Sequence, residues 1–191
     1  MKPFIVVATL LAVFAARSAS AQFFVSPFVD TTLSSPSALG SSSAPGLGIS
    51  FGNMGKIIGG ETEFAYHPQL IDNAANALAK NKVYTFSANT LIGPTIGRVK
   101  PYGAIGAGDL FLNVTKLSSL VIPNPESLSN NYFTINVGGG VMGFPTGHLG
   151  VRGDLRYFRA YGFKLADLAT TGIALDRFDF WRASVGLALK F

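Results

Sequence analysis

The C-terminal stretch reads Trp181-Arg182-Ala183-Ser184-Val185-Gly186-Leu187-Ala188-Leu189-Lys190-Phe191. Its odd-numbered residues are apolar, whereas its even-numbered residues are basic or small. Successive side chains of a β-strand point to opposite faces, so this alternation predicts a strand that ends at the C-terminal residue. One face of that strand suits an apolar solvent, and the other suits a polar or closely packed interior.

Similar alternation recurs from residue 22 onward and predicts eight strands, at residues 22–31, 45–53, 57–66, 82–92, 99–112, 131–143, 148–159 and 178–191. Three connections between them are short and rich in Gly and Pro, and four are long. A soluble β-sandwich also alternates, but it would not be expected to combine strands this long with a regular short-long rhythm. We therefore predict an all-β fold, an eight-stranded antiparallel transmembrane β-barrel of up-and-down topology with its long loops outside the cell.

The N-terminal residues have the features of a secretory signal peptide. Lys2 is followed by an apolar run over residues 4–16 and by the small residues Ala19-Ser20-Ala21. The run is too short for a membrane-spanning helix, which needs about 20 apolar residues. We expect a signal peptide at residues 1–21, cleavage between Ala21 and Gln22, and a barrel domain at residues 22–191.

The composition excludes several classes of function. The chain has no cysteine, so disulfides and Cys-based metal sites are excluded, and we expect no cofactor and no metal. Removing Lys2 and Arg17 from the 15 basic residues leaves 13 against 10 acidic residues, a formal charge of +3. These charges are scattered rather than clustered, which argues against a nucleic-acid partner.

Charged residues decide which face of each strand points inward. In strand seven we place Arg152, Asp154 and Arg156 inward, since a one-residue slip would turn all three toward lipid. The outer face of the strand is then apolar. For strand five we place Asp109 inward, which turns Tyr102, Ala104, Leu110 and Leu112 outward. The predicted lumen charge network consists of Glu61, Glu63, Asp109, Arg152, Asp154, Arg156 and Arg182.

Two interpretations of these inward charges stay open. The first interpretation is a structural network that fills the lumen, because an eight-stranded barrel is only just wide enough for side chains and buried charges need partners. The other is a gate for ions or small solutes, in which the charges exchange partners to open a channel.

Three segments carry a family resemblance: Lys100–Gly108, Gly150–Phe158 and the ending Val185–Phe191. With the signal sequence, they resemble the bacterial outer-membrane β-barrel superfamily, which includes the transmembrane domain of outer membrane protein A. The resemblance covers the mature chain and implies a place in the bacterial outer membrane, among its lipids and lipopolysaccharide. It implies that Phe191 is the signal for the barrel-assembly machinery. A periplasmic peptidoglycan-binding domain like that of outer membrane protein A is not expected here.

Other functions are weighed against a structural or porin-like role. The long loops could bind an external ligand, which makes surface adhesion an alternative. Some small barrels modify lipid A, but a hydrolase triad needs a serine and an acid beside a histidine, and no spacing selects a serine for His67 or His148. We expect the protein not to be an enzyme.

Overall fold

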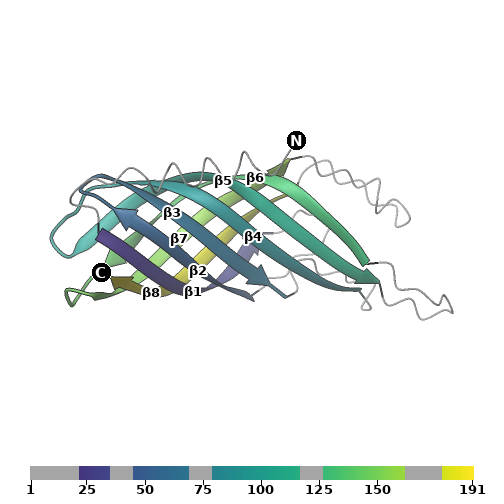
Figure 1. The fold of residues 1–191 in the computed structure, drawn as a ribbon, viewed down its shortest axis with the longest axis horizontal. Helices are drawn as coiled ribbons and strands as arrows, with labels where there is room; N and C mark the ends of the chain where they lie inside the picture. Colours follow the sequence, from purple (N-terminus) through teal and green to yellow (C-terminus); the bar gives the residue numbers. More distant parts are fainter. Residues whose placement is uncertain (1–21, 35–44, 69–78, 117–126, 162–177) are drawn as a thin grey trace.

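The computed structural model describes residues 22–34, 45–68, 79–116, 127–161 and 178–191. Within these ranges the chain forms eight strands: β1 (Gln22–Ser34), β2 (Pro45–Met54), β3 (Ile58–His67), β4 (Ala79–Ile92), β5 (Val99–Lys116), β6 (Ser127–Gly143), β7 (Leu149–Tyr161) and β8 (Phe178–Lys190). Each strand pairs antiparallel with the next, and β1 pairs with β8, which closes the barrel (Figure 1). The predicted fold class is confirmed.

The described part of the chain forms no helix with the length and hydrophobicity that crossing a bilayer requires.

The strands differ from their predicted ranges mainly at one end of the barrel. There β5 extends to Lys116 instead of residue 112, and β6 begins at Ser127 instead of residue 131. Thr115 pairs with Ser127, so the backbone ladder continues through these extensions. They are rich in Asn, Ser, Thr and Lys, and apolar alternation therefore does not mark them.

The two ends of the barrel are built differently. The C-terminus and the three short connections lie at one end, here called the turn end, at the left of Figure 1. In the connection between β4 and β5, Ile96 and Val99 exchange backbone hydrogen bonds of 2.8 and 3.0 Å. Gly97 has a φ of 61°, which glycine adopts without steric cost. The four longer connections leave from the opposite end, here called the loop end.

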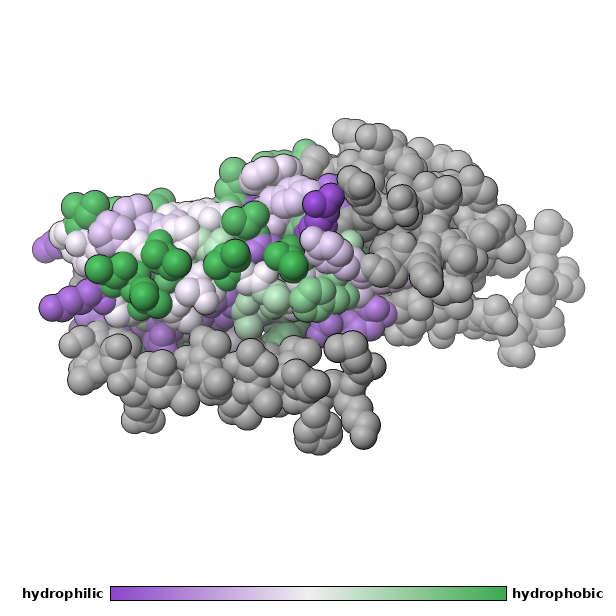
Figure 2. Space-filling view, turned by 90° about the horizontal axis from the view of Figure 1, so that it is seen from above, coloured by the Kyte–Doolittle hydropathy of each residue, from purple (hydrophilic) through white to green (hydrophobic). Residues whose placement is uncertain are grey.

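The outer wall of the barrel is apolar. Val185, Leu187 and Phe191 of the C-terminal stretch are exposed, whereas Arg182 and Ala188 are buried inside, as their alternation predicts. The inward orientation predicted for Glu61 and Glu63 of β3 and for the three charged residues of β7 is likewise confirmed by the burial patterns of these strands. Figure 2 shows hydrophobic side chains gathered on this wall, with hydrophilic ones toward its ends.

The predicted orientation of strand five is wrong. Tyr102, Ala104 and Leu110 are buried in the lumen, and Asp109 lies on the outward face of β5 between Phe86 and Phe133 of the neighbouring strands. The side chain of Leu112 lies outside the described part of the structure. Phe133 pairs with Tyr161, the last residue of β7, so Asp109 lies at the level where β7 ends. A charge on the lipid face costs less near the end of a barrel than at the bilayer midplane, which is consistent with an outward carboxylate at this level.

Candidate functional site

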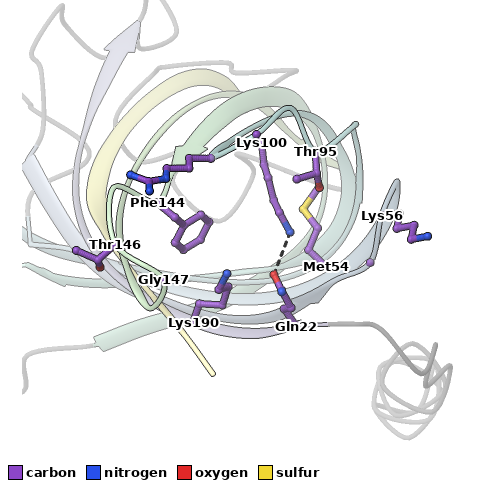
Figure 3. A pocket seen from close by; sticks show the side chains of 12 residues that line it. Gln22, Met54, Lys56, Thr95, Lys100, Phe144, Thr146, Gly147 and Lys190 are labelled. Carbon is purple, nitrogen blue, oxygen red and sulfur yellow. Dashed lines mark hydrogen bonds between the residues drawn. The ribbon is translucent and has the colours of Figure 1, made fainter.

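The lumen side chains form layers, and the first lies at the turn end. A pocket of about 490 Å³, here called the mouth pocket, opens there (Figure 3). Four basic residues and no acidic residue line it: Lys56, Arg98, Lys100 and Lys190. Arg98 Nη1 donates a hydrogen bond of 3.0 Å to the Pro145 carbonyl, which links two of the short connections. No pattern in the sequence predicted this pocket, because its basic residues come from separate turns and strands.

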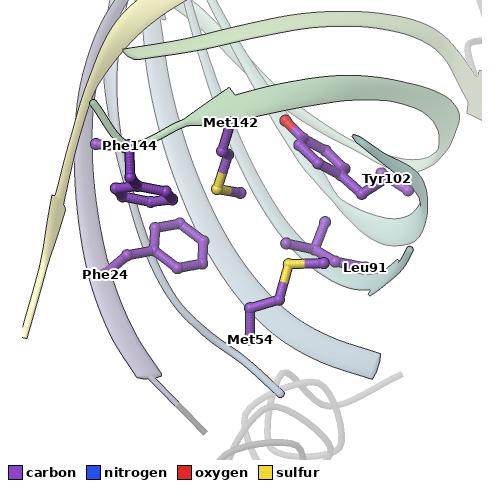
Figure 4. Close-up of a cluster of buried hydrophobic side chains, with 8 residues drawn as sticks. Phe24, Met54, Leu91, Tyr102, Met142 and Phe144 are labelled. Carbon is purple, nitrogen blue, oxygen red and sulfur yellow. The ribbon is translucent and has the colours of Figure 1, made fainter. Parts of the chain in front are cut away.

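An apolar cluster forms the next layer (Figure 4). Its buried members come from six strands and one turn: Phe24, Met54, Leu91, Tyr102, Ala104, Met142, Phe144 and Ala188. Met54 and Phe144 also line the mouth pocket, so the two layers are in direct contact. Figure 4 shows Phe24 and Phe144 side by side, with Met54 and Met142 directed toward the same space. The cluster therefore lines the lumen with apolar side chains at this level.

Arg152 of β7 is the centre of the third layer. Its guanidinium donates hydrogen bonds to Glu61 of β3, to Ser50 Oγ of β2 at 3.0 Å and to Tyr102 Oη of β5 at 2.7 Å. A further bond of 3.1 Å joins Nη2 to Asp154 Oδ2. In an eight-stranded ring β3 and β7 are four strands apart, on opposite walls. The pair between Arg152 and Glu61 therefore crosses the whole lumen.

Arg156 and Arg182 extend these contacts toward the loop end. Arg156 Nη2 donates to Glu61 Oε1 at 2.7 Å, and its Nη1 lies 3.5 Å from Glu63 Oε2. Arg182 of β8 donates to Glu63, and its Nε lies 3.7 Å from Asp30 Oδ2. Arg182 also lies over the Phe158 ring, at 4.6 Å from its centroid. Each arginine thus has carboxylate partners on another strand.

Asp30 and His67 end the charged layer. His67 Nε2 lies 2.9 Å from Asp30 Oδ1, and both side chains are fully buried. We call the connected charged groups the ion-pair network; its members are Asp30, Glu61, Glu63, His67, Arg152, Asp154, Arg156 and Arg182. Within it, four carboxylates face three guanidinium groups and one imidazole, so its charges nearly balance.

The structure brings together six of the seven residues predicted for the lumen network, and Asp109 is the exception. Asp30 and His67 belong to the network and Tyr102 contacts it, but none of the three was predicted to do so. The alternation Phe24, Ser26, Phe28, Asp30 could have indicated Asp30, since all four are buried on one face of β1. Tyr102 was predicted to face outward because Asp109, on the opposite face of β5, was wrongly placed inward.

His67 is the last residue of β3, and its side chain lies inside the barrel against Asp30. The serines of residues 35–43 and 118–119 lie outside the described residues, so no serine of these segments is placed beside it. In the part of the chain that the structure describes, no three His, Asp or Glu side chains are arranged to hold a metal ion.

The predicted export and assembly signals are placed only in part. Ala21 lies outside the described residues, and Gln22 begins β1, so the cleavage site stays a prediction. Phe191 N donates a backbone hydrogen bond of 2.9 Å to Phe23 O, and its side chain is 75% exposed at the turn end. Its role as an assembly signal, with the barrel-assembly machinery as partner, also stays a prediction.

Comparisons with known proteins agree with this architecture. The model of the outer membrane protein beta-barrel domain family matches residues 6–191, so the chain belongs to this family of bacterial outer-membrane proteins. No curated protein matches the chain in sequence.

Solved structures with the same fold come from several bacteria. The neisserial surface protein A is 17% identical with a TM-score of 0.66, covering 90% of this chain and 99% of that one. Ail, the attachment invasion locus protein of Yersinia pestis, in complex with a heparin analogue, is 14% identical with a TM-score of 0.58, covering 90% and 99%. The N-terminal barrel of OprF from Pseudomonas aeruginosa is 15% identical with a TM-score of 0.51, covering 89% and 97%. At these identities the similarity concerns the fold.

We predict that Glu61→Gln lowers the free energy of unfolding by roughly 3–5 kcal/mol, because it leaves Arg152 and Arg156 without their shared carboxylate. Urea titration of the protein folded into lipid vesicles measures this loss. The matched control is Asp109→Asn, which changes an acid to an amide outside the lumen and should not lower stability. Equal losses in the two variants would contradict the pairing.

Proposed function

We propose that this protein is a structural outer-membrane barrel with a sealed lumen, which anchors its four longer connections at the cell surface. The turn end would face the periplasm, and the loop end would face outward, among lipopolysaccharide. The observation that carries the proposal is the pair between Arg152 and Glu61, which joins opposite walls of the barrel.

A channel is the less favoured alternative. A path through the lumen would have to separate the ion pairs of Arg152 and Arg156 and displace the apolar cluster as well. Leaving a buried charge without its partner costs several kcal/mol, and exposing the cluster to water adds to that cost. Two stacked barriers of different chemistry favour a closed barrel over a gate that opens by exchange of ion-pair partners.

We predict that the purified protein produces no stepwise conductance in planar lipid bilayers, with a porin as positive control. Glu61→Ala and Arg152→Ala should also remain silent, because the apolar cluster still closes the turn end. Conductance steps in the wild type would contradict the sealed barrel and favour the gate. Steps that appear only in these two variants would contradict closure by the apolar cluster alone and assign the seal to the pair between Arg152 and Glu61.

Surface recognition is a second candidate, and the length of β5 and β6 favours it. At 18 and 17 residues they are longer than the roughly 9–11 residues a membrane-spanning strand needs, so they would hold the connection between them away from the membrane. Ail, which shares the fold, is described as an attachment protein and was solved with a heparin analogue. A sulfated polysaccharide is therefore a reasonable first probe.

We expect cells that carry the protein to bind immobilised heparin, and deletion of residues 118–125 to reduce that binding while heat-modifiable migration on gels is kept. The matched control deletes a similar length, residues 36–43, from a different connection. Binding that is absent in the wild type, or unchanged in both deletions, would count against recognition through the connection between β5 and β6.

A further inference from the structure

The mouth pocket differs from the rest of the lumen in its charge. Inside the barrel each arginine has a carboxylate partner on another strand, as described above. In the mouth pocket, by contrast, four basic residues gather without an acidic one, and among the described residues none of the four forms an ion pair with a carboxylate. Closure of the lumen does not account for this excess of positive charge, because the charges inside the barrel are paired with carboxylates.

Lys100 and Lys190 form the inner part of this site. Figure 3 shows both side chains directed into the pocket, whereas Lys56 points away from it. Lys100 is only 8% exposed, and its Nζ donates a hydrogen bond of 3.4 Å to the neutral amide oxygen of Gln22. Lys190 Nζ lies 5.1 Å from the centroid of the Phe144 ring, and the two lysines repel one another. A buried ammonium group without a counter-charge is unfavourable, and a bound anion would supply that charge.

The surroundings indicate the kind of anion. Arg98 is fixed at the rim by the Pro145 carbonyl, and Met54 and Phe144 provide an apolar floor. Lysines bind phosphate as point charges, and arginine donates to the same oxygens from a planar fork. The volume of about 490 Å³ falls in the range of small-ligand pockets, so a phosphate group fits with or without an attached headgroup.

We propose that the mouth pocket is a binding site for a phosphate group, held between Lys100 and Lys190 with Arg98 at the rim. The phosphate can come from the headgroup of a phospholipid in the adjacent leaflet or from a free phosphate in solution. Both sources present anionic phosphate oxygens to the same three cations, so the experiment has one arm for each.

The first arm titrates inorganic phosphate into the full-length mature protein in maltoside micelles and follows binding by calorimetry. The second arm adds phosphatidylglycerol to the same micelles and counts the lipid molecules retained in native mass spectrometry. The test variant is Lys100→Gln/Lys190→Gln. The control, Lys82→Gln/Arg159→Gln, removes two positive charges from the outer face near the loop end. Heat-modifiable migration checks that each variant is folded.

We expect saturable binding in at least one arm, weakened at least tenfold by the test variant and unchanged in the control. Binding of inorganic phosphate assigns the site to a free phosphate, and retention of phosphatidylglycerol alone assigns it to a lipid headgroup. If the wild type binds neither, or if the test variant binds as well as the wild type, the proposal is overturned. The wild-type measurement alone can overturn it should the test variant fail to fold.

Discussion

The need to pair charges inside a narrow barrel is the constraint on which the rest of this structure depends. Arg152 and Glu61 lie on opposite walls, and each would be unfavourable in the lumen without the other. Because Arg156 shares Glu61 with Arg152, and Arg182 shares Glu63 with Arg156, the pairs form one connected network. The network fixes the distance between walls that the backbone ladder connects only around the circumference.

The same alternation that supplies these charges also supplies the apolar outer wall. On β7, Arg152, Asp154 and Arg156 point inward, so Val151 and Leu155 must point outward. A one-residue slip would at once expose three charges to lipid and bury apolar groups among polar ones. Register and lumen chemistry are therefore two consequences of one pattern. The register directs the charges inward, and their pairing across the lumen makes that burial tolerable.

Sequence alone was sufficient for the strands and for most of the charged lumen residues, since period-two alternation reports directly which side chains share a face. The prediction failed for β5, where the position of a single polar residue was used to decide which face points inward. Asp109 of β5 lies at the level where β7 ends, and a carboxylate can point outward there. Placing it inward reversed the predicted orientation of β5 and put Tyr102 on the wrong face. The mouth pocket was beyond sequence reasoning, because Lys56, Arg98, Lys100 and Lys190 meet only after the barrel closes.

Water access to the lumen tests the central claim most directly. The chain has no native cysteine, so single-cysteine variants can be labelled without background. Ser50 is fully buried beside Arg152, and Thr146 is exposed on a short turn. In the folded protein a small methanethiosulfonate reagent should modify Thr146→Cys rapidly and leave Ser50→Cys unmodified until the barrel is unfolded. Modification of Ser50→Cys in the folded barrel at a rate similar to Thr146→Cys would contradict a sealed lumen.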